Sequence, residues 1–104
     1  LILSGDMPFV SRALVEGLIR SLRLRDRAVF SLSDAGFGFP AVLRSGALSA
    51  VEAQLARRRY SIQALAAALD ARGRRPTRAL SEDLFNLNTP ADLEAARTIW
   101  LRRK

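Results

Sequence analysis

Apolar residues along the chain follow two kinds of spacing, which together predict alternating helices and strands. Apolar side chains three and four positions apart predict helices over residues 11–22, 47–57, 61–71 and 90–101. Short apolar runs predict strands over residues 1–3, 27–33, 39–43, 77–80 and 84–88. The first of these runs is almost entirely apolar. We therefore expect an α/β fold with a mainly parallel sheet.

The same spacing predicts which side chains face the core and where elements end. In the last helix, the inward face is expected to consist of Leu93, Ala96 and Trp100. A glycine-bearing turn over residues 34–38 separates the two middle strands, and Gly73 is expected to end the third helix. In the helix over residues 47–57, the predicted inward side chains are Leu48, Val51 and Leu55.

Polar side chains follow two of the apolar runs and precede a helix in each case. Asp6 comes after residues 1–3, and Asn86 and Asn88 stand just before the last helix. Open α/β sheets bind ligands at such strand ends. Because side chains alternate along an extended segment, Asn86 and Asn88 share one face, beside the positive end of a helix. Two amides there can hold a phosphate ester, a purine edge or a metal-bound water, but asparagines that simply form a turn have the same pattern.

The start of the last helix is defined residue by residue. Thr89 suits the N-cap, Pro90 suits the first helical position, and the carboxylate of Asp92 can reach back to the free N–H of the cap. Asn86 and Asn88 are therefore expected to lie directly before a helix N-terminus.

Composition restricts the chemistry available to these polar groups. The chain has 104 residues, which is enough for one domain, and it contains neither cysteine nor histidine. Disulfides, thiolate metal sites, the usual zinc ligands and the usual general base are therefore missing. Any metal must be a hard ion held by oxygen atoms, and Mg²⁺ is the first candidate.

The charge is strongly positive, with 17 Lys and Arg against 10 Asp and Glu and a net charge of +7. Such a balance favours anionic partners, either nucleic acid or a phosphorylated small molecule, although a solvated surface explains it equally well. The aromatic residues do not form an RNA-stacking pattern, so nucleic acid is the less favoured partner. The basic residues concentrate in residues 20–27, 57–59, 72–78 and 102–104.

The chain has no apolar run of membrane-spanning length and no signal-peptide pattern at its start, so we expect a cytoplasmic protein without a membrane partner. It begins at Leu1, inside an expected strand, and its few short strands make a thin sheet with an exposed edge. We therefore expect the C-terminal half of a single domain, which self-associates or pairs with a missing N-terminal half.

Three motifs in this order and spacing are Ser-Gly-Asp-Met-Pro-Phe at residues 4–9, Gly-Phe-Pro-Ala-Val-Leu at 38–43 and Phe-Asn-Leu-Asn-Thr-Pro-Ala-Asp-Leu at 85–93. They resemble the later motifs of the molybdenum cofactor guanylyltransferases, which belong to the Rossmann-like nucleotidyltransferases. The resemblance covers essentially the whole chain. It implies a Rossmann-like three-layer α/β/α fold with a mainly parallel sheet, of which the N-terminal half is missing.

The resemblance also implies an activity, the transfer of GMP from GTP to the phosphate of molybdopterin cofactor, with release of pyrophosphate and a requirement for Mg²⁺. Asp6 would be the catalytic metal ligand, Asn88 a second metal or substrate contact, and Asn86 a contact to the pterin side. A carboxylate-held Mg²⁺ offsets the repulsion between the two phosphate anions, while arginines bind the phosphates. The remaining substrate-binding candidates in the motifs are Pro8, Gly38 and Pro40.

The chain also departs from that family. Phe39 stands where the family usually has a histidine, and the glycine-rich N-terminal loop, the basic phosphate-binding residues and the base-recognition segment are absent, so we expect no transfer by this chain alone. Two alternatives remain. One is a nucleotidyltransferase of the same fold that uses another phosphorylated acceptor, and the other is a small basic nucleic-acid-binding module, which only the charge favours.

Overall fold

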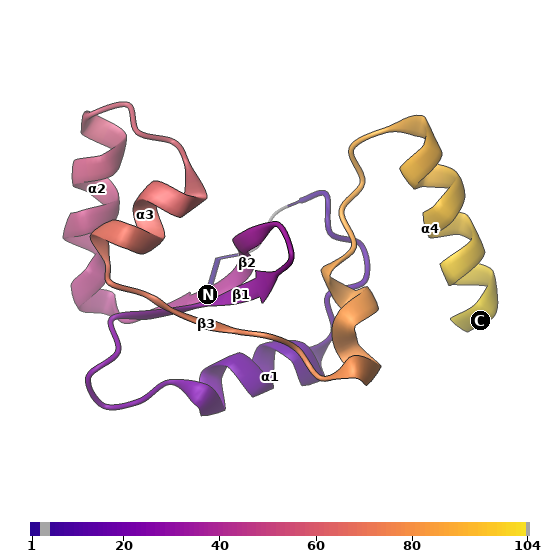
Figure 1. Ribbon diagram of the computed structural model, residues 1–104, viewed down its shortest axis with the longest axis horizontal. Helices are drawn as coiled ribbons and strands as arrows, with labels where there is room; N and C mark the ends of the chain where they lie inside the picture. Colours follow the sequence, from indigo (N-terminus) through magenta and orange to yellow (C-terminus); the bar gives the residue numbers. More distant parts are fainter. Residues whose placement is uncertain (3–4, 104) are drawn as a thin grey trace.

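The computed structural model describes residues 1–2 and 5–103 and contains a three-stranded sheet with helices packed on both of its faces (Figure 1). No helix in this described part of the chain is long and apolar enough to cross a membrane. In chain order the elements are α1 (Arg12–Ser21), β1 (Ala28–Ser33), β2 (Gly36–Leu43), the 3₁₀ helix η1 (Ser45–Ala47), α2 (Leu48–Ala56), α3 (Ile62–Ala68), β3 (Arg72–Arg74), the 3₁₀ helix η2 (Arg78–Leu84) and α4 (Pro90–Arg103).

The sheet has the order β2-β1-β3, in which β1 runs antiparallel to β2 and parallel to the short β3. The expectation of a mainly parallel, Rossmann-like three-layer sandwich is therefore wrong. Only Asp34 and Ala35 connect β1 to β2, and so short a connection can join only antiparallel strands. Gly36, directly after this turn, has a φ of 103°, a conformation that glycine adopts without steric cost.

The third strand lies where the sequence analysis predicted none. Gly73, expected to end a helix, is the middle residue of β3. A Cβ atom at this position would lie 3.1 Å from a ring carbon of Phe37 and 3.2 Å from Leu32, so glycine allows β3 to lie close against the hairpin. The predicted strands over 77–80 and 84–88 are also wrong, because Arg78–Leu84 forms η2 and the segment after it is irregular.

The core lies on both faces of β1, whose successive side chains point to opposite helical layers. Phe30 is fully buried and belongs to a cluster with Ala66 and Leu69 at α3, whereas Val29 is fully buried against Leu18 of α1. α1 begins as predicted, because the hydroxyl oxygen of its N-cap Ser11 accepts from the N–H of Leu14 at 3.2 Å.

Two helices bury less of their apolar faces than predicted. In α4 only Ala96 of the predicted face is buried, while Leu93 and Trp100 are each 59 % exposed. The reason is that α4 stands beside the sheet rather than on it (Figure 1). In α2, Leu48 and Leu55 are likewise exposed, and the buried residue is Gln54.

The predicted first strand pairs with β2 at a single position. Ile2 and Ala41 exchange two backbone hydrogen bonds of 2.8 and 3.0 Å in an antiparallel bridge. Leu3 lies outside the described residues, and Leu1 is exposed rather than buried. The start of the chain therefore lies beside β2, on the opposite side of the sheet from β3.

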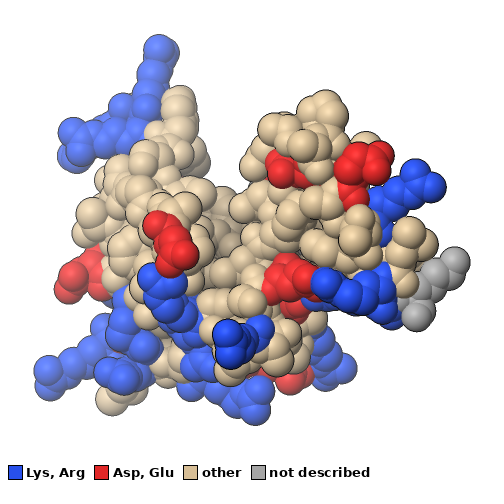
Figure 2. Space-filling model, turned by 45° about the vertical axis from the view of Figure 1, so that its right-hand side comes forward, with Lys and Arg blue, Asp and Glu red and all other residues tan. Residues whose placement is uncertain are grey.

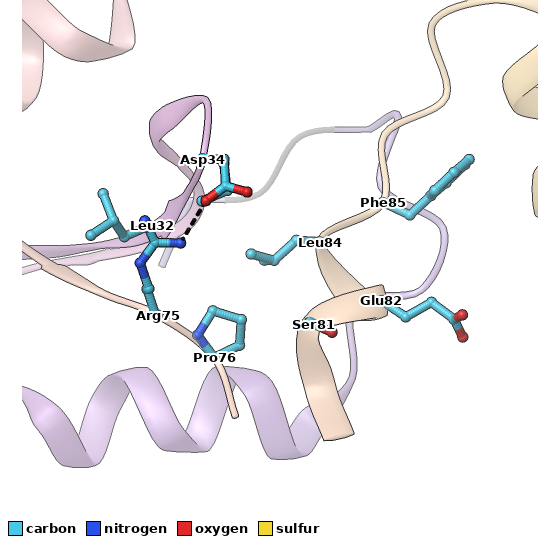
Figure 3. Close-up of a pocket in the computed structure, with 9 residues that line it drawn as sticks. Leu32, Asp34, Arg75, Pro76, Ser81, Glu82, Leu84 and Phe85 are labelled. Carbon is cyan, nitrogen blue, oxygen red and sulfur yellow. Dashed lines mark hydrogen bonds and ion pairs between the residues drawn. The ribbon is translucent and has the colours of Figure 1, made fainter. Parts of the chain in front are cut away.

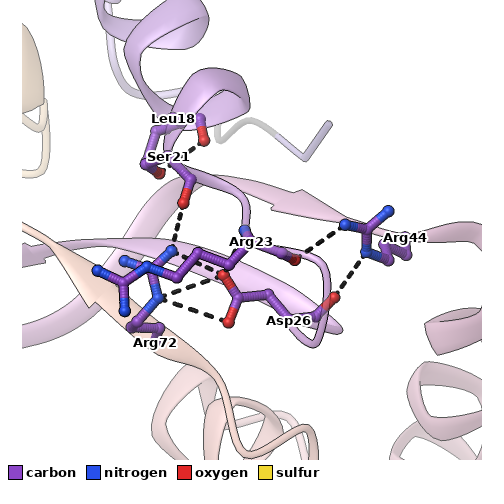
Figure 4. Close-up of polar contacts among 6 residues, drawn as sticks. All are labelled: Leu18, Ser21, Arg23, Asp26, Arg44 and Arg72. Carbon is purple, nitrogen blue, oxygen red and sulfur yellow. Dashed lines mark hydrogen bonds and ion pairs between the residues drawn. The ribbon is translucent and has the colours of Figure 1, made fainter.

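A set of ionic and polar contacts around Asp26, which we call the Asp26 junction, fixes the start of β1 (Figure 4). Arg72 donates to Oδ2 of Asp26 through Nη2 at 2.7 Å and Nε at 3.2 Å, and also to the carbonyl of Ser21. Arg44 donates to the carbonyls of Asp26 and Arg23 at 2.7 and 2.9 Å. The hydrogen bond from Arg72, followed by that from the backbone N–H of Arg23, holds the pKa of Asp26 below its ordinary value. The junction ties the α1–β1 loop to the ends of β2 and β3.

Candidate functional site

At the other end of β1 lies a cavity of about 390 Å³, which we call the polar cavity. It is bounded by the tip of the β1–β2 hairpin, the first turn of α3 and the two irregular segments that precede α1 and α4. Four of the predicted site residues line it, and they come from all three sequence motifs. Its polar lining residues are Asp6, Ser31, Ser33, Gln63, Asn86 and Asn88, and Gly38 contributes backbone.

The first and third motifs are held together by their backbones. The N–H of Leu87 donates to the carbonyl of Asp6 at 2.7 Å. On either side of Leu87, Asn86 and Asn88 both line the polar cavity, while Leu87 itself lines an apolar groove on the opposite side. Side chains thus alternate along this segment as in an extended chain, although it is not part of the sheet.

The start of α4 has the predicted capping arrangement. The N–H of Asp92 donates to Oγ1 of Thr89 at 3.1 Å, and Oδ2 of Asp92 accepts from the N–H of Thr89 at 3.0 Å. The same carboxylate accepts from the N–H of Asn88, also at 3.0 Å. Because Asp92 already uses these N–H groups, a ligand at this helix end meets the side-chain amides of Asn86 and Asn88 instead.

Hydrogen bonds from α3 and β1 fix the hairpin wall of the cavity. The side-chain amide of Gln63 accepts from the N–H of Phe37 at 3.2 Å and donates to its carbonyl at 2.7 Å. The buried hydroxyl of Ser31 donates to the carbonyl of Pro40 at 2.7 Å. This contact spans a register shift in the β1–β2 ladder, next to the cis peptide bond between Phe39 and Pro40.

Two predicted site residues lie outside the polar cavity. Pro40 is fully buried in β2, where it is part of the packed interior of the sheet. Pro8 lines the apolar groove beside α4. The structure thus brings Asp6, Gly38, Asn86 and Asn88 around one cavity and separates Pro8 and Pro40 from it.

Sequence reasoning did not select three polar residues of the cavity. Ser31 and Ser33 interrupt the apolar β1 at alternate positions, so their shared face could have been predicted from period-two spacing. Gln63 gave no comparable signal, because its position against the hairpin depends on how α3 packs.

A second cavity of about 350 Å³ adjoins the polar cavity and shares Ser33 and Leu84 with it (Figure 3). Figure 3 shows Leu84 pointing into this space and an ion pair between Asp34 and Arg75 at its edge. The pair is 3.1 Å long, and its side chains are largely exposed to solvent. Exposed ion pairs stabilise little, so Arg75 can exchange its contact with Asp34 for one with an anionic ligand.

The electrostatics of the two cavities differ. Asp6 is the only charged residue that lines the polar cavity, whereas the adjoining cavity is lined by the basic Arg75 and by two acidic residues, Asp34 and Glu82. Figure 2 shows Lys and Arg side chains crowded along the lower part of the molecule, where α1 lies in Figure 1. The two cavities thus offer a carboxylate in one lining and a guanidinium in the other.

The donor groups of the polar cavity are compatible with Mg²⁺ if water and substrate phosphates complete its coordination shell. It offers one carboxylate together with amide and hydroxyl oxygens, and the described residues contain no group of three or more acidic, His or Cys side chains placed to hold a metal ion. Protein-bound Mg²⁺ is commonly held by one or two carboxylates, with water and substrate phosphates completing the shell. The residues fit that mode and not a metal cage built by protein alone.

No family model matches the chain, and no curated protein or solved structure is significantly similar to it. Functional inference therefore rests on the geometry of the cavities and on the three motifs that surround them.

Proposed function

We propose that the polar cavity is the acceptor- and metal-binding site of a nucleotidyltransferase that transfers GMP from GTP to the phosphate of molybdopterin. One observation carries this proposal. Asp6, Gly38, Asn86 and Asn88, which lie in three motifs far apart in the sequence, line a single cavity. The compartment that we propose is the cytoplasm, which supplies nucleoside triphosphates.

In the proposed reaction, an oxygen of the acceptor phosphate forms a bond to the α-phosphorus of GTP, and the bond to pyrophosphate breaks. Asp6 and Asn88 would hold Mg²⁺, which when bound reduces the repulsion between the phosphate groups. Asn86 would accept from and donate to the polar edge of the acceptor's ring system. Arg75, from the adjoining cavity, would contact a phosphate.

The charge of the cavity supports a dependence on Mg²⁺. Asp6 is the single charged side chain of the lining, and a divalent cation between a carboxylate and a phosphate ester stabilises both anions. The proposal does not depend on a parallel sheet, because the residues come from irregular segments, the hairpin and the end of β1. A different phosphorylated acceptor would use the same groups, so the acceptor is the less constrained part of the proposal.

The basic surface seen in Figure 2 favours a second candidate function, the binding of nucleic acid. The dependence of binding affinity on salt concentration distinguishes the two functions. Nucleic-acid binding that involves six or more phosphate contacts should weaken roughly a thousandfold or more between 50 and 200 mM salt. Binding of one phosphate ester through Mg²⁺ should change far less.

The proposal is tested by titrating the chain with a fluorescent pterin bearing a phosphate ester, with and without Mg²⁺. We expect saturable binding that requires Mg²⁺ and is much weaker for the same pterin without its phosphate. A parallel titration with a labelled duplex and a labelled single strand over the same salt range provides the comparison. Binding of the pterin phosphate that is equal without Mg²⁺, or steeply salt-dependent binding of nucleic acid alone, would contradict the proposal.

A further inference from the structure

The first and last turns of α4 present apolar side chains to solvent. Leu93, Trp100 and Leu101 are each 59 % exposed, and the helix buries only Ala96. Among the described residues α4 therefore differs from α1, which buries Leu14 and Leu18. The apolar face of a helix normally packs against another element.

The exposed side chains adjoin a groove of about 520 Å³ between α4 and the two irregular segments of the site. Pro8, Phe9 and Leu87 form one wall of the groove. Leu93, Ala96 and Trp100, at positions i, i+3 and i+7 of α4, form the other. The groove and the exposed apolar side chains of the helix thus lie on one face of the molecule, which we call the α4 face.

Contacts at both ends hold α4 in this position. Its first turn is capped by Thr89 and Asp92, and at its last turn Arg103 pairs with the buried carboxylate of Asp83 at 2.9 Å. Arg103 also lies 4.9 Å from the ring centroid of Phe9. The helix is therefore held in place at both ends, so its exposed apolar residues are part of a defined surface.

The polar residues at the groove point to the partner. Glu94 and Arg97 are the two charged residues of its lining, and they lie three positions apart on α4. In an antiparallel pair of α4 helices with a twofold axis near Ala95, Glu94 of each copy would lie beside Arg97 of the other. The same arrangement brings Trp100 of each copy over the first turn of the other helix. The surface is thus complementary to itself in charge.

We propose that the α4 face binds a second copy of this chain through an antiparallel, twofold contact between the two α4 helices. Because each copy contributes the same face, the contact closes as a dimer and does not propagate. α4 has 14 residues and a length of about 21 Å, so the interface is of modest size. We expect dissociation in the micromolar range, with Trp100 shielded from water only in the dimer. This proposal is independent of the chemistry of the polar cavity.

The test uses sedimentation equilibrium over a concentration range, with the fluorescence of Trp100, the only tryptophan, followed on dilution. We expect a monomer–dimer equilibrium and a red shift of the emission as the dimer dissociates. Leu93→Asp should leave only monomer. Leu24→Asp is the matched control, because Leu24 is 94 % exposed on the loop between α1 and β1, away from α4, and its replacement should leave the equilibrium unchanged.

If Leu93→Asp disturbs folding, exchanging the charges of Glu94 and Arg97 provides a second test. Glu94→Arg and Arg97→Glu alone should each weaken the dimer by about fivefold or more, and the double variant should restore most of the loss. A wild-type chain that stays monomeric up to several hundred micromolar would overturn the proposal. A dimer that the double variant does not restore, or that Leu24→Asp disrupts as strongly as Leu93→Asp, would overturn it as well.

Discussion

At the start of β1, the carboxylate of Asp26 is engaged by side chains and backbone from neighbouring segments, whereas at the end of the same strand Ser31 and Ser33 face a cavity. The Asp26 junction consists of partly buried charges that bind one another. In the polar cavity, Asp6 is one of the lining residues, together with the amide side chains of Gln63, Asn86 and Asn88.

This difference shows that polar residues have two roles in this fold, one in its geometry and one in lining a cavity. A carboxylate whose partners come from the same chain contributes to the geometry of the fold, because its charge is already compensated. A carboxylate that lines a cavity is placed where it can take part in ligand binding. Substitutions at the two ends of β1 should therefore affect different measurements.

The largest expected effect belongs to Asp6→Asn. Loss of the only charged group of the cavity lining should weaken Mg²⁺-dependent binding of a pterin phosphate by about a hundredfold or more. The melting temperature should stay close to that of the wild type, because the cavity is not the core. Fluorescence titration and circular dichroism measure the two quantities. A large fall in melting temperature with unchanged binding would make Asp6 a structural residue.

Asp26→Ala should show the opposite behaviour. It removes the partner of Arg72 and the side-chain acceptor for the N–H of Arg23, so we expect the melting temperature to fall by roughly 5 °C or more. Ligand binding below the melting temperature should change little. Loss of binding in a folded Asp26→Ala variant would show that the two ends of β1 are not independent.

The pH dependence of stability should arise in part at the Asp26 junction. Contacts with Arg72, and then with Arg23, lower the pKa of Asp26, and those with Arg102 and Arg103 lower the pKa of Glu82. Their contributions are present above the unfolded carboxyl value of about 4 and are lost as the pH falls through the folded value. Urea unfolding between pH 7 and 2.5 should show this decrease. Asp26→Asn should be less stable at pH 7 and should lose less stability on acidification.

The smallest effect is expected for Gln63→Ala, which removes the side-chain amide that holds the hairpin tip on α3. Because Gln63 is exposed, we expect a stability loss of only about 0.5–1 kcal/mol. Ligand affinity should fall a few-fold through loosening of the cavity wall. Chemical denaturation and the same titration provide both values, and an unchanged affinity would limit Gln63 to a structural role.

The sequence predicted where helices begin better than how the elements pack against one another. Ser11 caps α1 and Thr89 with Asp92 caps α4, because each cap depends on a few neighbouring residues. The sheet could not be predicted in the same way. The turn at Asp34 and Ala35 carried the information for an antiparallel pair, but the apolar runs on either side were interpreted as parallel strands.

The sequence analysis selected the cavity residues that belong to the three motifs, and it missed those whose positions depend on tertiary packing. Asp6, Asn86 and Asn88 line one cavity, but they lie in irregular segments and not at the strand ends on which the expectation rested. Pro40 is buried through the register shift between β1 and β2, which the sequence does not reveal. The predicted inward faces of α2 and α4 were wrong for a related reason. Periodicity identifies the apolar face of a helix but does not show whether another element covers that face.

The segment Asn86–Leu87–Asn88 is a common wall, with its amides toward the polar cavity and Leu87 toward the apolar groove. Because these side chains stand on one short backbone segment, a ligand that shifted the segment on one side would also shift the wall of the other. If a second copy occupies the groove and a ligand occupies the cavity, their binding free energies are linked, and the linkage is reciprocal. Ligand affinity would then vary with protein concentration, and the dimerisation constant would vary with ligand concentration by the same factor.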